Sequence, residues 1–150
     1  MQRSTERLQA FACIAGGEEV PCLSGVVKFY QTKSGVMVEA DLYGLPGRDG
    51  IYGFHIHEGD SCCGEAFSET GNHFDPQQRK HPYHAGDLPP LFSCGGRAYM
   101  KVLTGRFRVA DILGRTVVIH SQSDDFRTQP GGDSGKKIAC GTIHPCGCRR

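Results

Sequence analysis

The fold class is decided by residues 36–43, which read Val-Met-Val-Glu-Ala-Asp-Leu-Tyr. Aliphatic side chains occupy every second position, so one face of the segment is apolar and the other meets water. This period of two predicts a half-buried β-strand, and Thr32–Gly35 before it reads as a hairpin turn. Together with the 21 glycines, which suggest many turns, similar runs predict an all-β fold. These further strands are expected at Phe11–Ile14, Val26–Gln31, Ile51–His57, Ala98–Thr104, Arg115–His120 and Ile138–Ile143.

Two long stretches lack any period and separate these strands. Residues 59–91 are rich in Gly, Pro and His, and residues 121–137 form a second irregular stretch. Loops longer than about 15 residues in a compact domain are usually functional or disordered. Because the first stretch holds many potential metal ligands, we expect it to be functional.

Length and charge limit the possible functions. A chain of 150 residues favours a single domain over residues 1–150. The formal net charge of +1 argues against a nucleic-acid-binding protein, which usually carries a strong basic excess. No apolar run approaches the roughly 20 residues that cross a membrane, and the start lacks the apolar stretch of a secretory signal. With Met1 as the first residue we expect a cytoplasmic protein, in which most of the eight cysteines stay reduced.

Two strand-like runs carry histidines on one face. In residues 54–57, Phe-His-Ile-His, alternation puts both apolar side chains towards the core and His55 and His57 on the outer face. The run Val-Val-Ile-His at residues 117–120 repeats this pattern and places His120 outward. These three imidazoles could converge on one ion, although solvated surface histidines would show the same pattern.

A second group of potential ligands lies in the first long loop. Three imidazoles and one carboxylate suit a closed tetrahedral zinc site, and imidazole-rich sites suit both copper and zinc. A polar loop that happens to contain histidine is the alternative. It is hard to sustain for both groups together, because they use six of the seven histidines in the chain. The members of this second group are His73, His81, His84 and Asp87.

Five segments in this order resemble the copper/zinc superoxide dismutase family. They are GFHIHEGD (53–60), GNHFDP (71–76), HAGDLP (84–89), VVIHSQSDDF (117–126) and TQPGGDSGKKIACGTI (128–143). The resemblance implies that copper is bound by His55, His57, His73 and His120, and zinc by His73, His81, His84 and Asp87. It further implies that Asp124 hydrogen-bonds one ligand of each metal and so orients their rings.

The resemblance also implies a fold and an activity. The fold would be an antiparallel, eight-stranded Greek-key β-barrel, an immunoglobulin-like sandwich, over about residues 9–143, with a short tail at 144–150 and two long functional loops. The activity would be dismutation of superoxide to dioxygen and hydrogen peroxide, with redox-active Cu²⁺ and structural Zn²⁺. His73 would be catalytic: it bridges the metals as an imidazolate, then releases copper and takes up a proton. Superoxide is the expected partner, and nucleic acid and membrane are not; a homodimer is considered, but the sequence leaves the oligomeric state open.

Three features depart from the common family pattern. The segment between His81 and His84 is much shorter than usual, although its ligand types survive. Lys137 stands where the family has its active-site arginine, so the charge that would guide the anion is kept while the planar fork of donors is lost. The tail adds Cys146 and Cys148 in a Cys-x-Cys arrangement that resembles a copper-transfer motif, although two incidental thiols would look the same.

The resemblance implies a disulfide between the metal loop and Cys140. Cys62, five residues after His57, is the expected partner, and Cys63 is the alternative. The remaining cysteines are interpreted as core residues or free thiols. A rival interpretation of the whole chain is a copper-binding or copper-delivery protein with little turnover, suggested by Lys137 and the Cys-x-Cys tail. The complete set of copper ligands favours the enzyme.

Overall fold

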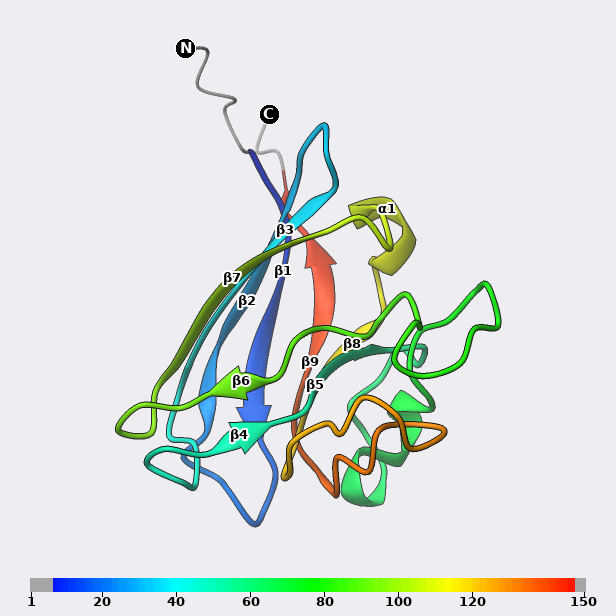
Figure 1. Cartoon of the computed structure of the whole chain (residues 1–150). Helices are drawn as coiled ribbons and strands as arrows, with labels where there is room; N and C mark the ends of the chain where they lie inside the picture. The colour runs from blue at the N-terminus through cyan, green and yellow to red at the C-terminus, as the bar shows by residue number, and fades with distance from the viewer. Residues whose placement is uncertain (1–6, 148–150) are drawn as a thin grey trace.

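The computed structural model describes residues 7–147, where the chain is built mainly of strands and loops (Figure 1). The strands are β1 (Arg7–Gly16), β2 (Ser24–Gln31), β3 (Val36–Tyr43), β4 (Ile51–Tyr52), β5 (Phe54–His57), β6 (Leu91–Phe92), β7 (Ala98–Thr104), β8 (Thr116–His120) and β9 (Lys137–Pro145). The helical segments are a 3-10 helix, η1 (Glu65–Thr70), and the single-turn helix α1 (Val109–Ile112). Neither of these described helices is long and apolar enough to cross a membrane. The predicted all-β class is confirmed.

Most of the strands pair as one curled antiparallel sheet. Seven of them follow the order β5-β8-β9-β1-β2-β3-β7, and β4 pairs separately with β6. Only Gly53 separates β4 from β5, and β6 lies beside β7, so the two sheets continue into each other around the barrel. The predicted eight strands are recovered when β4 and β5 are counted as one interrupted strand. The Greek-key topology follows because β3 pairs with β7 rather than β4, while β9 returns to pair with β1.

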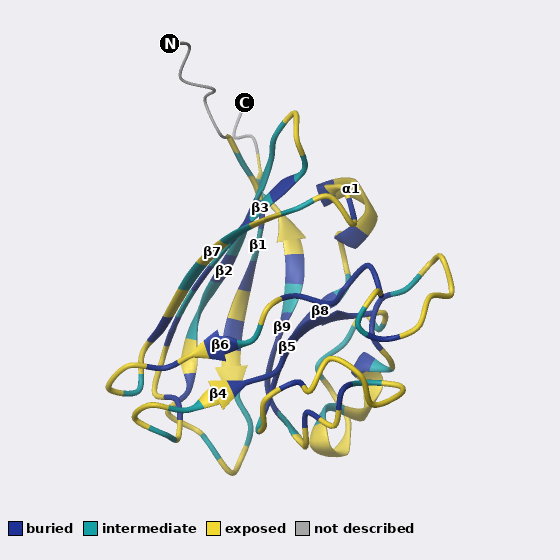
Figure 2. Cartoon of the chain, in the orientation of Figure 1, coloured by how far each residue is buried: buried dark blue, intermediate teal, exposed yellow. Residues whose placement is uncertain are grey.

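The core follows from the alternation that predicted it. In β3 the apolar positions are completely buried, whereas Met37, Glu39 and Asp41 between them are partly exposed. Figure 2 shows the same alternation of buried and exposed residues along the long strands. The turn before β3 is closed by a 2.8 Å hydrogen bond from Thr32 N to Gly35 O, as predicted. The buried positions of β3 are Val36, Val38, Ala40 and Leu42.

Sequence patterns missed the shortest elements and placed some strand ends too far inward. β6 has two residues and α1 four, which is too short for a period to show. β1 and β9 both extend beyond their predicted ends, because they pair with each other as well as with their other neighbours. As a result Lys137 lies in β9 rather than in the preceding loop.

The two long irregular stretches gather on the same side of the barrel (Figure 1). Residues 58–90 contain η1 and isolated bridges to β5, at His55 with Asp87 and at His57 with His73. The first stretch is tied to the barrel by a disulfide between Cys62 and Cys140, with an S–S distance of 2.04 Å. This is the expected pair, and it closes a loop of 78 residues in sequence.

Candidate metal centre

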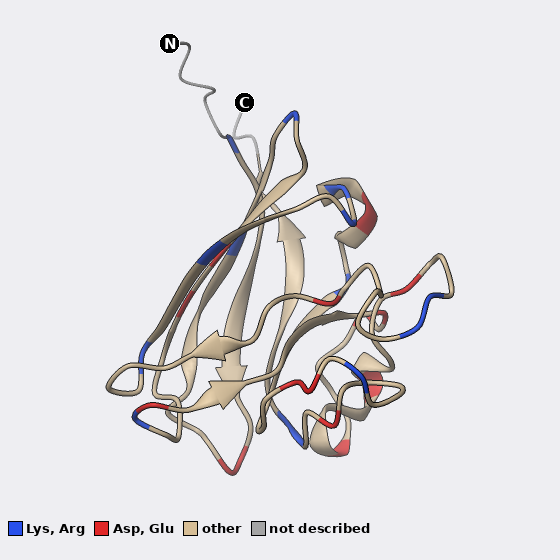
Figure 3. Ribbon diagram, viewed as in Figure 1, with Lys and Arg blue, Asp and Glu red and all other residues tan. Residues whose placement is uncertain are grey.

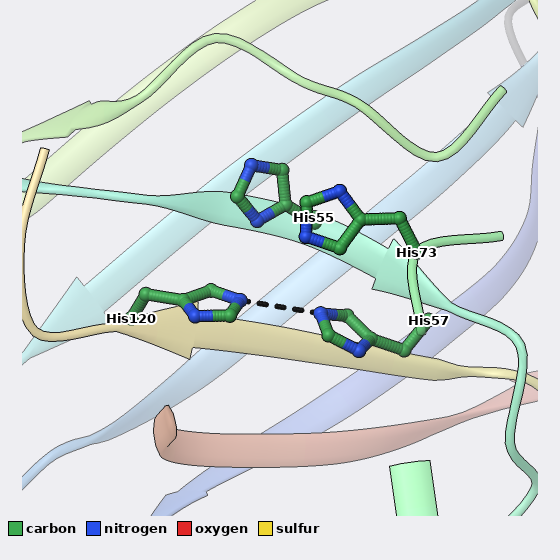
Figure 4. A group of neighbouring side chains, drawn as sticks. All are labelled: His55, His57, His73 and His120. Carbon is green, nitrogen blue, oxygen red and sulfur yellow. Dashed lines mark hydrogen bonds between the residues drawn. The ribbon is translucent and has the colours of Figure 1, made fainter. Parts of the chain in front are cut away.

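Three histidines project from paired strands into one place. His55 and His57 lie on β5, whose four residues pair with residues 116–119 of β8, and His120 is the last residue of β8 (Figure 4). Their apolar neighbours fill the barrel core, so the imidazoles lie on its outer face, as predicted. They are nevertheless buried, with exposed fractions of 0%, 2% and 6%, because the long loops cover them. Solvated surface histidines are therefore excluded.

The four loop residues also converge. His73, His81, His84 and Asp87 are all buried, and one possible ligand atom from each lies within 4.8 Å of the others. The Asp87 carboxylate is 2.8 Å from His73 Nδ1 and 3.2 Å from Nδ1 of both His81 and His84. The short spacing between His81 and His84 thus does not prevent the group from forming. Of the described histidines, His73 alone belongs to both groups, which makes it the link between them.

One carboxylate orients a ring of each group. Asp124 lies 2.8 Å from His55 Nε2 and 2.7 Å from His81 Nε2, so each ring donates its Nε2–H and leaves its Nδ1 with a lone pair. Both Nδ1 atoms are buried without a hydrogen-bond partner. Although burial alone would raise it, the hydrogen bonds with His55 and His81 hold the pKa of Asp124 well below its usual range.

A backbone carbonyl orients the ring of His57. His57 donates Nδ1–H to Gly71 O at 2.9 Å, so its Nε2 carries the lone pair. That Nε2 lies 3.2 Å from Nε2 of His120 (Figure 4). Burial lowers the pKa of His55 to about 4 and of His120 to about 3, and it also lowers that of His57, so these imidazoles are neutral near pH 7.

Buried imidazoles whose nitrogen atoms converge fit a metal ion. Buried polar atoms are normally hydrogen-bonded, and nitrogen lone pairs that point at one another are stabilised by a cation between them. The first group offers imidazoles alone and the second adds a carboxylate, which are donor sets for copper and zinc. The residues present therefore fit both metals.

A cavity of about 390 Å³ opens onto the first group. Its lining includes three of the histidines, His57, His73 and His120, and also Lys137. Lys137 Nζ donates to Thr70 Oγ1 at 2.8 Å and to Gly71 O at 3.1 Å, and burial lowers its pKa. The ammonium group is thus held at the cavity by the first loop.

Comparison with known proteins decides the family. The model of the family described as copper/zinc superoxide dismutase matches residues 23–143. The chain belongs to this family. It is 37% identical to the Cu-Zn superoxide dismutase of Legionella pneumophila over 82% of this chain and 79% of that protein. It is 35% identical to Cu-Zn superoxide dismutase A of Xenopus laevis over 93% of this chain and 99% of that protein.

Other proteins that are similar to this chain carry different names. The copper chaperone for superoxide dismutase of Mus musculus is 33% identical over 88% of this chain and 52% of that protein. Among solved structures, the clock protein EA4 matches with a TM-score of 0.80 and 29% identity over 97% of this chain and 99% of that one. A double mutant of a superoxide dismutase-like protein from Bacillus subtilis matches with a TM-score of 0.73 and 27% identity over 87% and 94% of the two chains. Membership of the family therefore does not by itself establish catalysis.

The remaining cysteines lie outside both groups. Cys13, Cys22, Cys63 and Cys94 are free and exposed, so they are thiols at the surface rather than core residues. Cys146 is a free, half-buried thiol, and Cys148 lies outside the described residues.

Several residues that shape the site were not found from the sequence. Gly132 is one: its φ is 73°, and a Cβ there would lie 2.0 Å from Asp124 Oδ1 and 2.6 Å from His81 Nε2. Only glycine lets the backbone approach this hydrogen bond so closely. Thr70 and Gly71, which hold Lys137, gave no signal either, because their contacts depend on the path of the loop.

Proposed function

We propose that the protein is a superoxide dismutase that holds copper at His55, His57, His73 and His120 and zinc at His73, His81, His84 and Asp87. The observation that carries the proposal is the convergence of buried imidazole nitrogens beside a cavity that also contains Lys137. An orienting group such as Asp124 is typical of metal-bound histidines.

The chain's own residues would bind, orient and move a proton. When bound, copper supplies the redox chemistry, accepting an electron from one superoxide and giving one to the next. His73 Nδ1 lies 2.8 Å from Asp87 and belongs to the zinc residues of the loop, which we call the loop group. Its Nε2 is then available to the copper residues, three of which lie on strands and which we call the strand group. We assign to His73 Nε2 the proton that is taken up in the first half of the reaction and passed to the forming peroxide in the second. Asp124 keeps the rings of His55 and His81 in place throughout.

Lys137 would attract the substrate. Superoxide is a small anion, and a fixed positive charge at the cavity raises its local concentration and association rate. The neighbouring Lys136 contributes less, because its Nζ is exposed and lies 3.3 Å from Glu19. In Figure 3 the basic and acidic residues are scattered along the ribbon, so a local positive charge at the cavity matters more than an overall field.

Metal analysis beside a dismutation assay tests the proposal. Protein reconstituted with both ions should hold one copper and one zinc per chain and should dismutate superoxide. Zinc binding without copper uptake under saturating Cu(II) would refute the copper assignment and the activity together.

A second candidate is copper delivery on the same fold. It is favoured by the similarity to a copper chaperone and by the free thiol of Cys146 in the tail. Thiolates prefer Cu(I), so a tail with two cysteines could accept it. Removal of the residues after Pro145 separates the two candidates. The enzyme should keep full activity once metallated, whereas loss of copper loading from a Cu(I) donor would support delivery.

Two further assignments remain predictions. A homodimer is tested by light scattering coupled to size-exclusion chromatography, and a cytoplasmic location by cell fractionation. Neither changes the chemistry assigned to the two groups.

A further inference from the structure

The backbone of His81 is held by a side chain from the second loop. The Gln129 amide accepts a hydrogen bond from His81 N at 3.0 Å and donates one to His81 O at 2.8 Å. The amide thus pairs with both backbone groups of a single residue. Because Asp124, in the same loop, takes the ring N–H of His81, this residue is fixed through both its side chain and its main chain.

The other end of the short segment is held from a different direction. Arg106 lies between β7 and α1, and its Nη1 donates to Pro82 O at 2.7 Å. The same nitrogen lies 3.3 Å from His84 O and 3.5 Å from Asp87 O. One guanidinium therefore reaches three carbonyls of the segment that carries three of the four loop ligands.

This segment has few hydrogen bonds of its own. Between His81 and Asp87, the backbone bonds are Tyr83 N to Lys80 O and Asp87 N to His84 O, with Gly86 bonded to Phe74 and Ile56. His81 N and O are satisfied by Gln129 alone among the described contacts, and Pro82 O by Arg106. A short loop without a ladder of its own needs such side chains to keep a fixed shape.

We propose that Gln129 and Arg106 are positioning residues for the zinc group, which set the places of His81 and His84 before any ion binds. The proposal rests on the assignment of zinc to this group. Neither side chain supplies a ligand, so each acts through the backbone of the ligands. Pre-organisation of this kind raises metal affinity because the ion no longer has to order the segment.

The hydrogen bonds from Gln129 and those from Arg106 should contribute differently to metal affinity. Gln129 makes two hydrogen bonds to one ligand, so Gln129→Ala should weaken metal binding about 10-fold. Arg106 makes one short bond and two longer ones, so Arg106→Ala should weaken binding about 3-fold. Arg106→Lys keeps a donor and should restore part of the loss. Gln129→Glu keeps the acceptor for His81 N but lacks the donor for His81 O, so it should lie between native protein and Gln129→Ala.

Cobalt titration of the full-length, copper-loaded protein tests the proposal. Co²⁺ takes the place of zinc, and its visible absorption reports both affinity and ligand geometry. Gln77→Ala and Arg79→Ala are the matched controls, because these residues are of the same two types and are exposed in the loop that carries the zinc residues. The proposal expects weaker binding and an altered cobalt spectrum for Gln129→Ala and Arg106→Ala, with both controls equal to native protein.

Each other outcome has a defined meaning. Native affinity and spectrum in both variants would overturn the proposal, and so would losses no greater than those of the controls. Weaker binding that only follows a lower melting temperature of the metal-free protein would also overturn it, since the role would then be stability alone. If Gln129→Ala does not fold, Gln129→Glu decides on the same criteria. Failure of the native protein to bind Co²⁺ would instead refute the assigned zinc group.

Discussion

The two metal groups are built on different kinds of backbone. Three of the four residues assigned to copper lie on β5 and β8, whose positions are set by the ladders of the barrel. All four residues assigned to zinc lie in a loop, and side chains from two other segments hold part of it. A strand delivers its side chains by alternation alone, whereas a loop must be fixed contact by contact.

His73 and Asp124 connect these regions. His73 is a loop residue that completes the strand group, and Asp124 bonds to one ring on each side. We therefore expect a change in the strand group to affect copper binding alone, and a change in a shared residue to affect the binding of both metals. The following changes test this division.

The largest effect should come from removing a strand ligand. His120→Ala should reduce dismutation to about 1% of the native rate or less, because loss of a direct ligand costs more than the roughly 10–100-fold typical of an outer partner. The matching change in the loop group is Asp87→Ala. It should lose zinc and loosen the loop, while copper remains at His55, His57 and His120. The metal content of both variants, measured by mass spectrometry, checks which residues hold which metal. Loss of copper with zinc retained in Asp87→Ala would show that the two assignments are reversed.

Breaking the tie between the loop and the barrel should have the next largest effect. Cys62→Ser combined with Cys63→Ser removes the disulfide to Cys140 and the neighbouring thiol that could replace it. In the chain-entropy model a loop of this length is worth about 4–5 kcal/mol, or about 10³-fold in the unfolding equilibrium. Denaturant unfolding of the metal-free protein measures the change. Cys63→Ser alone is the control and should be near native; equal losses in the two proteins would contradict the assigned role.

Asp124→Asn should damage both groups at once. An amide is uncharged, which weakens the hydrogen bond from each of the two rings, and it also replaces one acceptor with a donor, so one ring N–H group loses its partner altogether. Affinity for both metals should fall about 10–100-fold. Competition with chelators measures each affinity, and Asp60→Asn, an exposed change in the first loop, is the control. A loss confined to one metal would show that Asp124 does not couple the groups.

The smallest effect should come from Lys137, which contacts neither group directly as a ligand. Lys137→Glu should slow the reaction of the copper-loaded protein about 10-fold at low salt and reverse part of its salt dependence. Lys137→Ala should fall between Lys137→Glu and native protein, and Lys137→Arg should hold or raise the rate. Pulse radiolysis over a range of ionic strength measures these rates. Equal rates for the three variants would show that Lys137 does not guide the substrate.

Much of the barrel and both histidine groups could be predicted from the sequence. Alternation along residues 36–43 correctly gave the buried face of β3, and the same rule put His55 and His57 on one side of β5. Strand periodicity is local, so neighbouring residues carry it without knowledge of the rest of the fold.

The remaining features depend on contacts between distant segments. The burial of His55 comes from loops that no local pattern describes, and β6 is too short to show a period. Gln129 and Arg106 reach the loop group from residues 48 and 24 positions away in sequence from His81 and Pro82. A lone glutamine or arginine carries no signal of such a contact.

Donor counting at Lys137 gives one further consequence. A lysine ammonium has three N–H groups, and two of them are already engaged by Thr70 Oγ1 and Gly71 O. One N–H group remains for an anion that enters the cavity, so Lys137 can donate only one hydrogen bond to it. An arginine has five such groups, and the same two acceptors would leave three of them free. At this position, then, lysine in place of arginine keeps the positive charge but lowers the number of N–H donors that are free to bind the substrate.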